Sequence, residues 1–505
     1  MRVDRPRHRR PAGSSGLLIL VLACLVALNA CLPPPRPEPT PTPPPTSRAT
    51  ATGTAGSGTA GTVPELPAPS PGATSASPAA SPAASPATAT PAATQPARET
   101  PTPGQPPAPT QTPAAVQPAA PAAVNKRGVH LLLDDGNVRF PERVWEQHVS
   151  WARQLSGPGG YIVELVRSND LRPESWQHFV DLLAEYEQVP IFRLATFKDE
   201  KNQWWTAPAP DPDGLGYKSE ADRWRRFFDA LTWKSDTVLV TVGNETNRPD
   251  EWGGSPDPAA YARYLRDVAE ALRRVRSVKV LVLNGALDNY APSATFGRTF
   301  SIDSERYLED MAAEIPDIFD KLDGWAAHSY PLGPFGEPPG RQTFKIDDTR
   351  PTARPRRQPP GGIMNRGVNG YEWELWKLDQ LGAAKELPVY VTESGWRHVA
   401  SQSPNSSDKE YATVSNDRFA EMVTLAYDGP PDGKADGWTP WNKDPRVKAV
   451  ALFALAGRPD LWGHTNLLLV DPLGQVQGAY PFAEALARVY PGPVAQRTGT
   501  PEPPR

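Results

Sequence analysis

The sequence predicts a (β/α)8 TIM barrel over residues 125–492. Three observations predict this α/β fold: eight short runs rich in Val, Leu and Ile follow one another, segments with helical spacing lie between them, and about 370 residues suit one large domain. The competing fold is a doubly wound open sheet, in which a glycine-rich phosphate-binding turn is expected after the first strand. Residues 131–140 (LLLDDGNVRF) do not form such a turn.

Each of the eight runs is typical of a strand buried on both faces, because near-continuous apolar content marks parallel strands that helices cover. The runs are 128–133, 161–167, 189–195, 236–243, 278–285, 323–330, 387–393 and 447–455. Two of the helices between them are well marked. Residues 173–187 carry an apolar stripe, and residues 257–275 begin with Asp257 as an N-cap and Pro258 in the first turn.

The first 30 residues resemble a lipoprotein-type signal peptide. Five arginines in residues 2–10 precede an apolar run of 15 residues at 16–30, which is short for a spanning helix. The run leads into Cys31, and residues 28–31 (LNAC) resemble the bacterial lipobox, in which the cysteine is lipidated. The resemblance implies an exported protein that lipidated Cys31 anchors to the bacterial membrane, with its folded domain outside the cytoplasm. The alternative is an ordinary signal peptide cleaved nearby.

Residues 31–124 are predicted to be a disordered linker rich in Pro, Ala, Thr and Ser. Residues 32–124 contain 26 of the 62 prolines and almost no large apolar side chains. Such a segment cannot bury enough surface to offset the entropy lost on folding, so it acts as a spacer. The tail at 493–505 is predicted to be disordered as well.

Composition excludes several classes of function. The net charge of −4 argues against a nucleic-acid partner. The only cysteines, Cys24 and Cys31, lie in the N-terminal segment, so neither a disulfide scaffold nor a zinc–thiolate site is expected. The seven histidines form no HxH or HExxH motif, and no phosphate-binding loop is present. We therefore expect no metal and no cofactor, and we expect a monomer.

Candidate functional residues stand where the predicted strands end, because the active sites of such barrels lie at the C-terminal ends of the strands. Asn244 and Glu245 follow the fourth run, and Glu393 ends the seventh. His328 and Tyr330 end the sixth run. A single glutamate at a strand end is weak evidence for catalysis, since such a glutamate often only pairs with an arginine. An Asn-Glu pair, a His-x-Tyr motif and a second glutamate at the ends of the fourth, sixth and seventh runs are much less often found together by chance.

This pattern resembles clan A of the retaining glycoside hydrolases, in which an Asn-Glu pair ends the fourth strand and a second glutamate ends the seventh. The resemblance covers about residues 128–490. It implies that Glu245 is the acid/base and Glu393 the nucleophile. It also implies that Asn244 binds the sugar 2-OH, that Tyr330 orients Glu393, and that His328 supports this network.

The chemistry explains why two glutamates are needed. Retaining glycosidases hold two carboxyl groups about 5–5.5 Å apart, one protonated to donate to the leaving oxygen and one ionised to attack the anomeric carbon. Their closeness helps to separate the two pKa values, because like charges disfavour double ionisation. We expect Glu245 to be the protonated partner.

The resemblance also implies an arginine near the nucleophile. Arg167, at the end of the second run, and Arg193, within the third, are both candidates, and the sequence does not choose between them. Trp252, Trp396 and Trp462 follow the fourth, seventh and eighth runs, where they could stack on pyranose rings. The eighth run lacks the tryptophan that many clan members carry, and the sequence offers Trp462, in the next loop, as its substitute.

A long insertion at 331–370 follows the sixth run. It contains the basic residues Arg350, Arg354, Arg356 and Arg357, which could meet an acidic polysaccharide. Segments of this length on the active face are lids, cleft walls or disordered loops, and a solvated loop is the interpretation we favour.

The sequence therefore predicts a retaining glycoside hydrolase that acts on a β-linked polysaccharide or oligosaccharide. Two alternatives remain: a cell-surface glycan-binding protein without turnover, and a transglycosylase that remodels exopolysaccharide or wall. All three share a carbohydrate ligand at the same strand ends.

Overall fold

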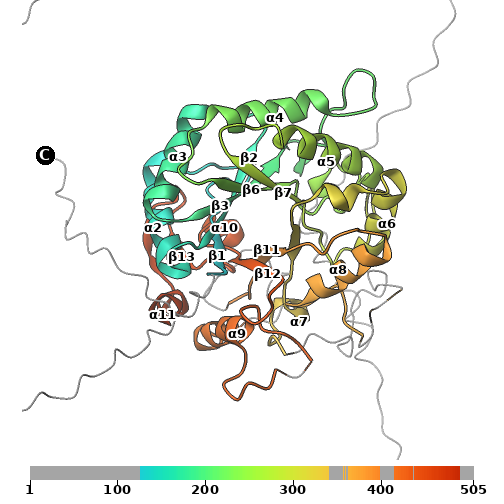
Figure 1. Cartoon of the computed structure of the whole chain (residues 1–505). Coiled ribbons are helices and arrows are strands. Elements are labelled where there is room, and N and C mark those ends of the chain that lie inside the picture. The colour runs from blue at the N-terminus through green and yellow to red at the C-terminus, as the bar shows by residue number, and fades with distance from the viewer. Residues whose placement is uncertain are drawn as a thin grey trace, which may run out of the picture. The chain divides into compact units, whose positions relative to one another are not determined.

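Eight parallel strands form a barrel in the computed structural model, which describes residues 125–340, 357, 359, 362–398, 414–435 and 437–489 (Figure 1). The strands, in the order in which they pair, are β10 (Trp325–His328), β11 (Val389–Ser394), β12 (Val447–Leu452), β1 (Arg127–His130), β2 (Tyr161–Arg167), β3 (Val189–Ala195), β6 (Thr237–Val242) and β7 (Lys279–Asn284). Each of the eight predicted runs overlaps one of these strands, which confirms the predicted fold class.

Contacts between β7 and β10 close the barrel. Leu283 and Gly324 form a parallel bridge there, and the Asp323 amide donates to the Val282 carbonyl at 2.8 Å. The Asn284 side chain spans the same seam, because its amide donates to the Ala326 carbonyl at 3.0 Å and its oxygen accepts from the Ala326 amide at 2.8 Å. The carboxyl ends of all eight strands therefore lie at one mouth.

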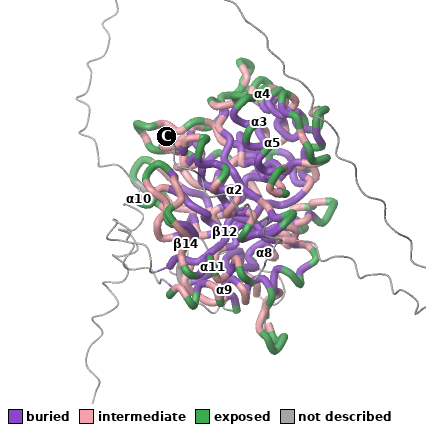
Figure 2. Tube along the Cα trace, turned by 90° about the vertical axis from the view of Figure 1, so that its left-hand side faces the viewer, coloured by how far each residue is buried: buried purple, intermediate pink, exposed green. Residues whose placement is uncertain are grey.

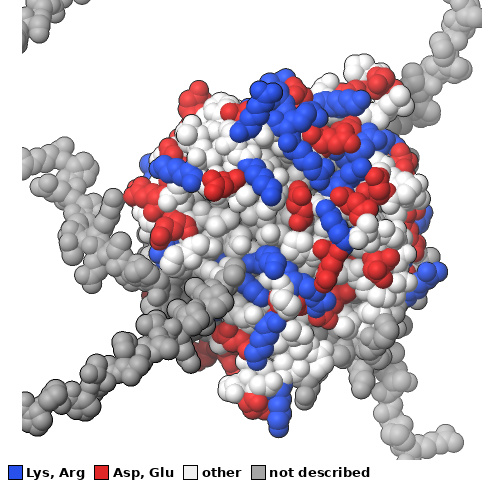
Figure 3. Space-filling view, in the orientation of Figure 1, with Lys and Arg blue, Asp and Glu red and all other residues white. Residues whose placement is uncertain are grey.

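Helices surround the barrel in the order that the sequence predicts. The longer ones are α2 (Trp145–Ser156), α3 (Pro173–Glu185), α4 (Lys218–Ala230), α5 (Pro258–Leu272), α6 (Ser304–Glu314), α8 (Gly370–Gln380), α9 (Asn416–Asp428) and α11 (Pro481–Val489). The predicted N-cap of α5 is correct, since the Asp257 carboxylate accepts from the Ala260 amide at 2.9 Å. On the side of α4 and α5, charged residues of both signs are interspersed (Figure 3).

Short helices and two-stranded sheets lie in the loops between the main elements. They are η1 (Glu142–Val144), η2 (Pro249–Glu251), η3 (Ile318–Lys321), α7 (Leu332–Phe335) and α10 (Pro459–Trp462), and the antiparallel pairs β4 (Lys198–Asp199) with β5 (Trp204–Trp205), β8 (Ala294–Phe296) with β9 (Thr299–Ser301), and β13 (Leu468–Val470) with β14 (Val476–Ala479). The three strand pairs were not predicted, because their strands are only two to four residues long.

Two layers of apolar side chains pack on the two faces of the sheet. Figure 2 marks the buried residues in purple along the backbone. Val163, Ile191, Leu239 and Tyr390 belong to the cluster inside the barrel. A larger cluster fills the space between the sheet and the helices. Both faces of each strand are thus buried, which is why the strands are apolar along their whole length.

The predicted signal segment, lipidation site, linker and tail all lie outside the described residues. So do Arg350, Arg354 and Arg356 of the basic insertion, whereas Arg357 is described and exposed. Among the helices of the described residues, none has the length and hydropathy needed to cross a bilayer.

One buried carboxyl group makes the stability of the fold depend on pH. Glu164 on β2 faces the helix layer, where its Oε2 accepts from the Leu133 amide at 3.1 Å and Oε1 has no hydrogen-bond partner. Burial raises the pKa of Glu164 to about 8, although the Leu133 amide opposes the shift. The folded state therefore binds a proton that the unfolded state has lost between about pH 4.5 and pH 8.

We expect Glu164→Gln to stabilise the protein increasingly as the pH rises through this range. The wild-type folded state loses stability by at most about 1.4 kcal/mol per unit of pKa separation, while the amide has no proton to lose. Chemical denaturation of both proteins at pH 5 and pH 8 measures the difference. Equal changes in the free energy of unfolding between the two pH values would show that Glu164 titrates normally.

Candidate active site

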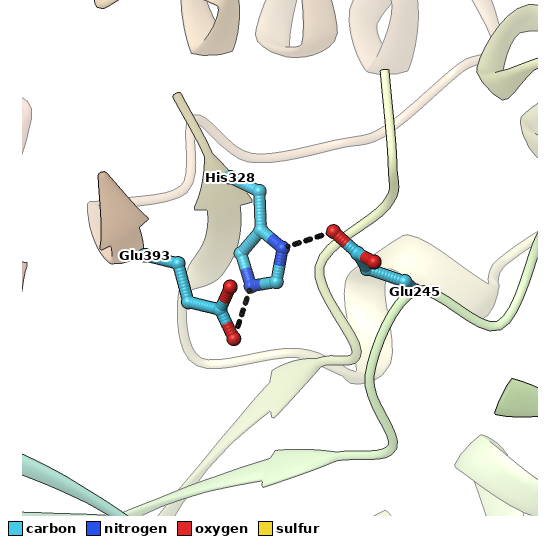
Figure 4. Close-up of side chains that lie close together, drawn as sticks. All are labelled: Glu245, His328 and Glu393. Carbon is cyan, nitrogen blue, oxygen red and sulfur yellow. Dashed lines mark hydrogen bonds and ion pairs between the residues drawn. The ribbon is translucent and has the colours of Figure 1, made fainter. Parts of the chain in front are cut away.

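Glu245, His328 and Glu393 meet at the mouth of the barrel, as Figure 4 shows. The His328 ring lies between the two carboxylates, with Nδ1 at 2.8 Å from Oε1 of Glu245 and Nε2 at 3.6 Å from Oε1 of Glu393. One oxygen of each glutamate and one ring nitrogen all lie within 4.8 Å of one another. The residues that the sequence places at three separate strand ends are thus brought together.

An irregularity in β11 directs Glu393 toward the mouth. Val389 and Val391 face the helix layer and Tyr390 faces the barrel interior, so strict alternation would turn Glu393 outward. The register of β11 shifts against β12 between Val391 and Ser394, and β10 is also irregular beside it. Bulges of this kind re-aim side chains next to active sites.

The chain leaves β6 through a strained turn that presents Glu245. Gly243 has φ +90° and Glu245 has φ +36°, a left-handed value that a side chain with a Cβ rarely adopts. The Glu245 amide donates to the Ala286 carbonyl at 2.7 Å, which holds the turn. Gly285 must lack a side chain, because a Cβ there would lie 2.8 Å from the Gly243 carbonyl carbon.

Glu393 has a hydrogen-bond donor, a guanidinium and an imidazole around it. The Tyr330 hydroxyl donates to its Oε2 at 3.0 Å, and Arg193 Nη1 and His130 Nε2 lie 3.7 Å and 3.8 Å from its Oε1. Burial raises the pKa of Glu393, the charge of Glu245 adds to this, and His328, Arg193 and Tyr330 oppose it. The net shift is upward.

Glu245 has closer cationic partners. Arg248 Nη1 lies 3.2 Å from its Oε2, and His328 binds its Oε1. Burial raises the pKa of Glu245, but Arg248, His328 and Arg193 together outweigh burial and lower it to about 2. The nearest cationic groups therefore lie beside Glu245, and the two glutamates titrate as a coupled pair.

The remaining titratable groups respond to the same cluster. Burial opposes a charge on His328, yet the carboxylates of Glu393 and Glu245 raise its pKa. Burial, Arg193 and His328 lower the pKa of His130 well below its usual value. Burial raises the pKa of Glu251, on η2, to about 8, although Arg193 opposes the shift. Arg193 joins these groups, with Nη2 at 3.5 Å from Glu251 Oε2.

The structure separates the two candidate arginines. Arg193 faces Glu393, whereas Arg167 Nη2 pairs with Asp134 Oδ2 at 2.8 Å. The pleat turns both side chains to the barrel side, since Arg193 has the parity of Ile191 and Arg167 that of Val163. The two differ in their position along the sheet, because Arg193 pairs with Leu165 whereas Arg167 lies two residues nearer the strand end, opposite Ala195. Arg167 belongs instead to a charge network between the first two loops.

Two of the three candidate tryptophans do not offer an open face to a ligand. Trp396 is 1% exposed, and its Nε1 donates to the Glu337 carbonyl at 2.9 Å. Trp252 is 5% exposed and packs edge-on against Tyr261, whose hydroxyl bridges the ends of β6 and β7. Both rings belong to the core cluster, and this burial argues against the expected stacking on sugar rings. Trp462 is partly exposed and packs in a small cluster that includes Tyr330, so it remains a candidate.

Asn244 lies beside Glu245 and is 8% exposed. It lines a cavity of about 20 Å³ together with Glu251, Trp205, Thr206 and Trp252, which gives room for about one water molecule.

Sequence reasoning missed Arg248 and Glu251 as members of this site. Both follow Glu245 within six residues, in the charged stretch 248–251 (RPDE), and this was the available signal. His130, at the end of β1, also joins the site, with its Nε2 at 3.8 Å from Glu393 Oε1. Glu245, His328 and Glu393 do carry atoms of the kind that hold a metal ion, but the guanidinium groups of Arg193 and Arg248 beside them oppose a cation.

Neither a protein-family model nor a curated protein sequence matches the chain. Solved structures do match it. They include GH5_18 from Streptomyces cattleya in complex with Manβ1-4GlcNAc, at 18% identity and TM-score 0.42 over 75% of this chain and 82% of that one. A psychrophilic β-glucosidase from Micrococcus antarcticus matches at 15% identity and TM-score 0.38, covering 68% and 85%. A GH26 endo-β-1,4-mannanase from Bacillus sp. JAMB-750 matches at 14% and 0.37, covering 72% and 85%. Matches at this level do not decide what this chain does.

The contacts of His328 make a prediction that does not require activity. We expect its imidazole to titrate above the usual value of 6.5, and we expect Glu393→Gln to lower that pKa, because the variant removes a negative charge at 3.6 Å. A pH titration of the histidine ring signals by NMR, assigned with His328→Gln, measures both values. An unchanged titration in Glu393→Gln would contradict the geometry.

Proposed function

We propose that this protein is a retaining glycoside hydrolase that cleaves β-linked polysaccharide or oligosaccharide. The observation that carries the proposal is the pair of carboxylates from the ends of β6 and β11, with oxygens of Glu245 and Glu393 within 4.8 Å of each other. A pair this close leaves no room for a water molecule between the carboxylate and the sugar, so it suits double displacement rather than inversion.

In the first step the Glu393 carboxylate attacks the anomeric carbon, and the bond to the leaving oxygen breaks. The proton on Glu245 moves to that oxygen, which leaves a glycosyl ester on Glu393. In the second step Glu245 takes a proton from water, the water oxygen bonds to the anomeric carbon, and the ester bond to Glu393 breaks. Both glutamates return to their starting states.

The surrounding residues have roles that their contacts support. Tyr330 and Arg193 hold the Glu393 carboxylate, the first by a hydrogen bond and the second by its charge. Asn244, next to the acid/base in the chain, would bind the sugar 2-OH, and Trp462 would meet a ring face. The two glutamates titrate as a coupled pair, and the first step needs the form that carries the proton on Glu245.

We expect Glu393→Gln and Glu245→Gln each to abolish the release of reducing ends from the substrate. The panel would include β-glucan, mannan, xylan, galactan and acidic glycans. A loss of at least about 10³-fold is expected, because removing an essential nucleophile or acid costs several kcal/mol of barrier. Glu421→Gln, an exposed glutamate on α9, is the matched control.

Azide assigns the two roles separately. With an activated aryl glycoside, Glu245→Ala plus azide should give a glycosyl azide of retained configuration, because azide replaces water on the glycosyl ester. Glu393→Ala plus azide should give the inverted anomer. Exchanged outcomes would reverse the assignment. Saturable binding without turnover in the wild type would favour the glycan-binding alternative, and products longer than the substrate would favour transglycosylation.

We also propose that Cys31 anchors the protein to the outer side of the bacterial membrane. The support is the arginine-rich start, the short apolar run and the LNAC sequence. Expressed in a bacterial host, wild-type protein should incorporate radiolabelled palmitate and sediment with membranes. Cys31→Ala should do neither, and labelling of the variant would exclude this cysteine as the acceptor.

A further inference from the structure

Arg248 occupies an unusual place beside the acid/base. Its Nη1 lies 3.2 Å from Glu245 Oε2 and 3.6 Å from Asp288 Oδ2. Its Nε and Nη2 donate to the two oxygens of Asp250 at 2.9 Å and 2.7 Å. The guanidinium is therefore shared among three carboxylates, of which only Glu245 belongs to the catalytic pair.

The position of this guanidinium is built into the turn. The Arg248 amide donates to the Glu245 carbonyl at 2.8 Å, which closes the turn after β6. The two bonds to Asp250 fix the plane of the fork, since paired donors and a carboxylate meet in one geometry. Buried Asn247 links the turn to the next loop by hydrogen bonds with the backbone of Asp288 at 2.9 Å and 3.0 Å. Arg248 thus points Nη1 at Glu245 before any ligand arrives.

Other titratable and charged groups also face Glu245, and their effects on it differ from that of Arg248. They are Asp250 and Glu251 from η2, Asp288 from the loop after β7, His328 and Tyr330 from β10 and its extension, Glu393 from β11, and Arg193 from β3. His328 is shared with Glu393 and loses its charge at high pH. Arg193 is engaged by Glu393 and Glu251. Arg248 keeps its charge at every accessible pH and touches Glu245 but not Glu393.

We propose that Arg248 is a positioning residue that, together with Asp250, sets the pH range in which Glu245 can donate its proton. This inference rests on the proposed function. The cation favours the carboxylate form of Glu245, and Asp250 offsets part of that charge. The proton that the first step delivers to the leaving oxygen must reside on Glu245 beforehand, so the Arg248–Asp250 pair shifts the working range toward acid.

The direction of the effect follows from the sign of each charge. Arg248→Gln removes the cation and raises the pKa of Glu245, so Glu245 keeps its proton to higher pH. Asp250→Asn removes an anion, leaves the cation less compensated, and lowers that pKa. Two neighbouring substitutions should thus move the same profile in opposite directions, which loss of structure alone would not do.

The test compares the pH dependence of kcat/KM for the full chain with an aryl β-glycoside of the class identified by the panel. For Arg248→Gln we expect the limb set by the titration of Glu245 to move toward alkali by about 1–3 pH units, as for a carboxylate that loses an adjacent arginine. For Asp250→Asn we expect it to move toward acid. Arg226→Gln, which removes an exposed pair with Asp222 on α4, is the matched control and should leave the limbs in place.

Profiles of both variants that superimpose on the wild type after scaling would overturn the inference. If thermal melting shows that Arg248→Gln is unfolded, the pH profile of Asp250→Asn alone tests the inference. If the wild type has no activity, the proposed function fails, and the inference is tested by NMR of ¹³C-carboxyl-labelled glutamate. There the Glu245 signal, assigned with Glu245→Gln, should titrate at higher pH in Arg248→Gln, and an unshifted signal would overturn it.

Discussion

A partly buried and a buried carboxylate within 4.8 Å of each other repel, and the mouth of this barrel is organised around that repulsion. His328 lies between them and contacts both. Arg193 stands on the side of Glu393 and Arg248 on the side of Glu245. Neither glutamate could be buried at this distance without the compensating groups, because an unpaired buried charge is costly.

Closure of the barrel is what makes this arrangement possible. Glu245 follows β6 and His328 ends β10, and these strands reach each other only through β7 and the seam that Asn284 bridges. The glutamates come from segments 148 positions apart in the chain, yet both carboxylates contact the same imidazole. An open sheet would leave β7 and β10 as edges and separate the two sides of the site. The fold therefore sets the distance on which the proposed double displacement depends.

The two glutamates are equivalent in chemistry but not in surroundings. Glu245 has a guanidinium at 3.2 Å, while His328 and Arg193 lie 3.6 Å and 3.7 Å from Glu393, which also accepts a hydrogen bond from a tyrosine hydroxyl. This asymmetry lowers the pKa of one and leaves the other raised by burial. Environment, rather than residue type, divides the roles of paired carboxylates. The Arg248–Asp250 pair extends this division to a residue outside the catalytic set.

The sequence by itself determined the eight strands, their order and the residues at their ends. Strand burial on two faces leaves a continuous apolar run, and the barrel places every carboxyl end at one mouth, so Glu245, His328, Tyr330 and Glu393 could be named from the pattern. Only the tertiary structure decided which arginine meets Glu393, because Arg167 and Arg193 differ in the loops they face rather than in sequence context. Only the tertiary structure showed that Trp396, which follows a strand, is buried in the core. The pKa shifts of Glu245 and Glu393 depend on side chains such as Arg248 that lie within a few ångströms of them. A sequence pattern does not contain such distances.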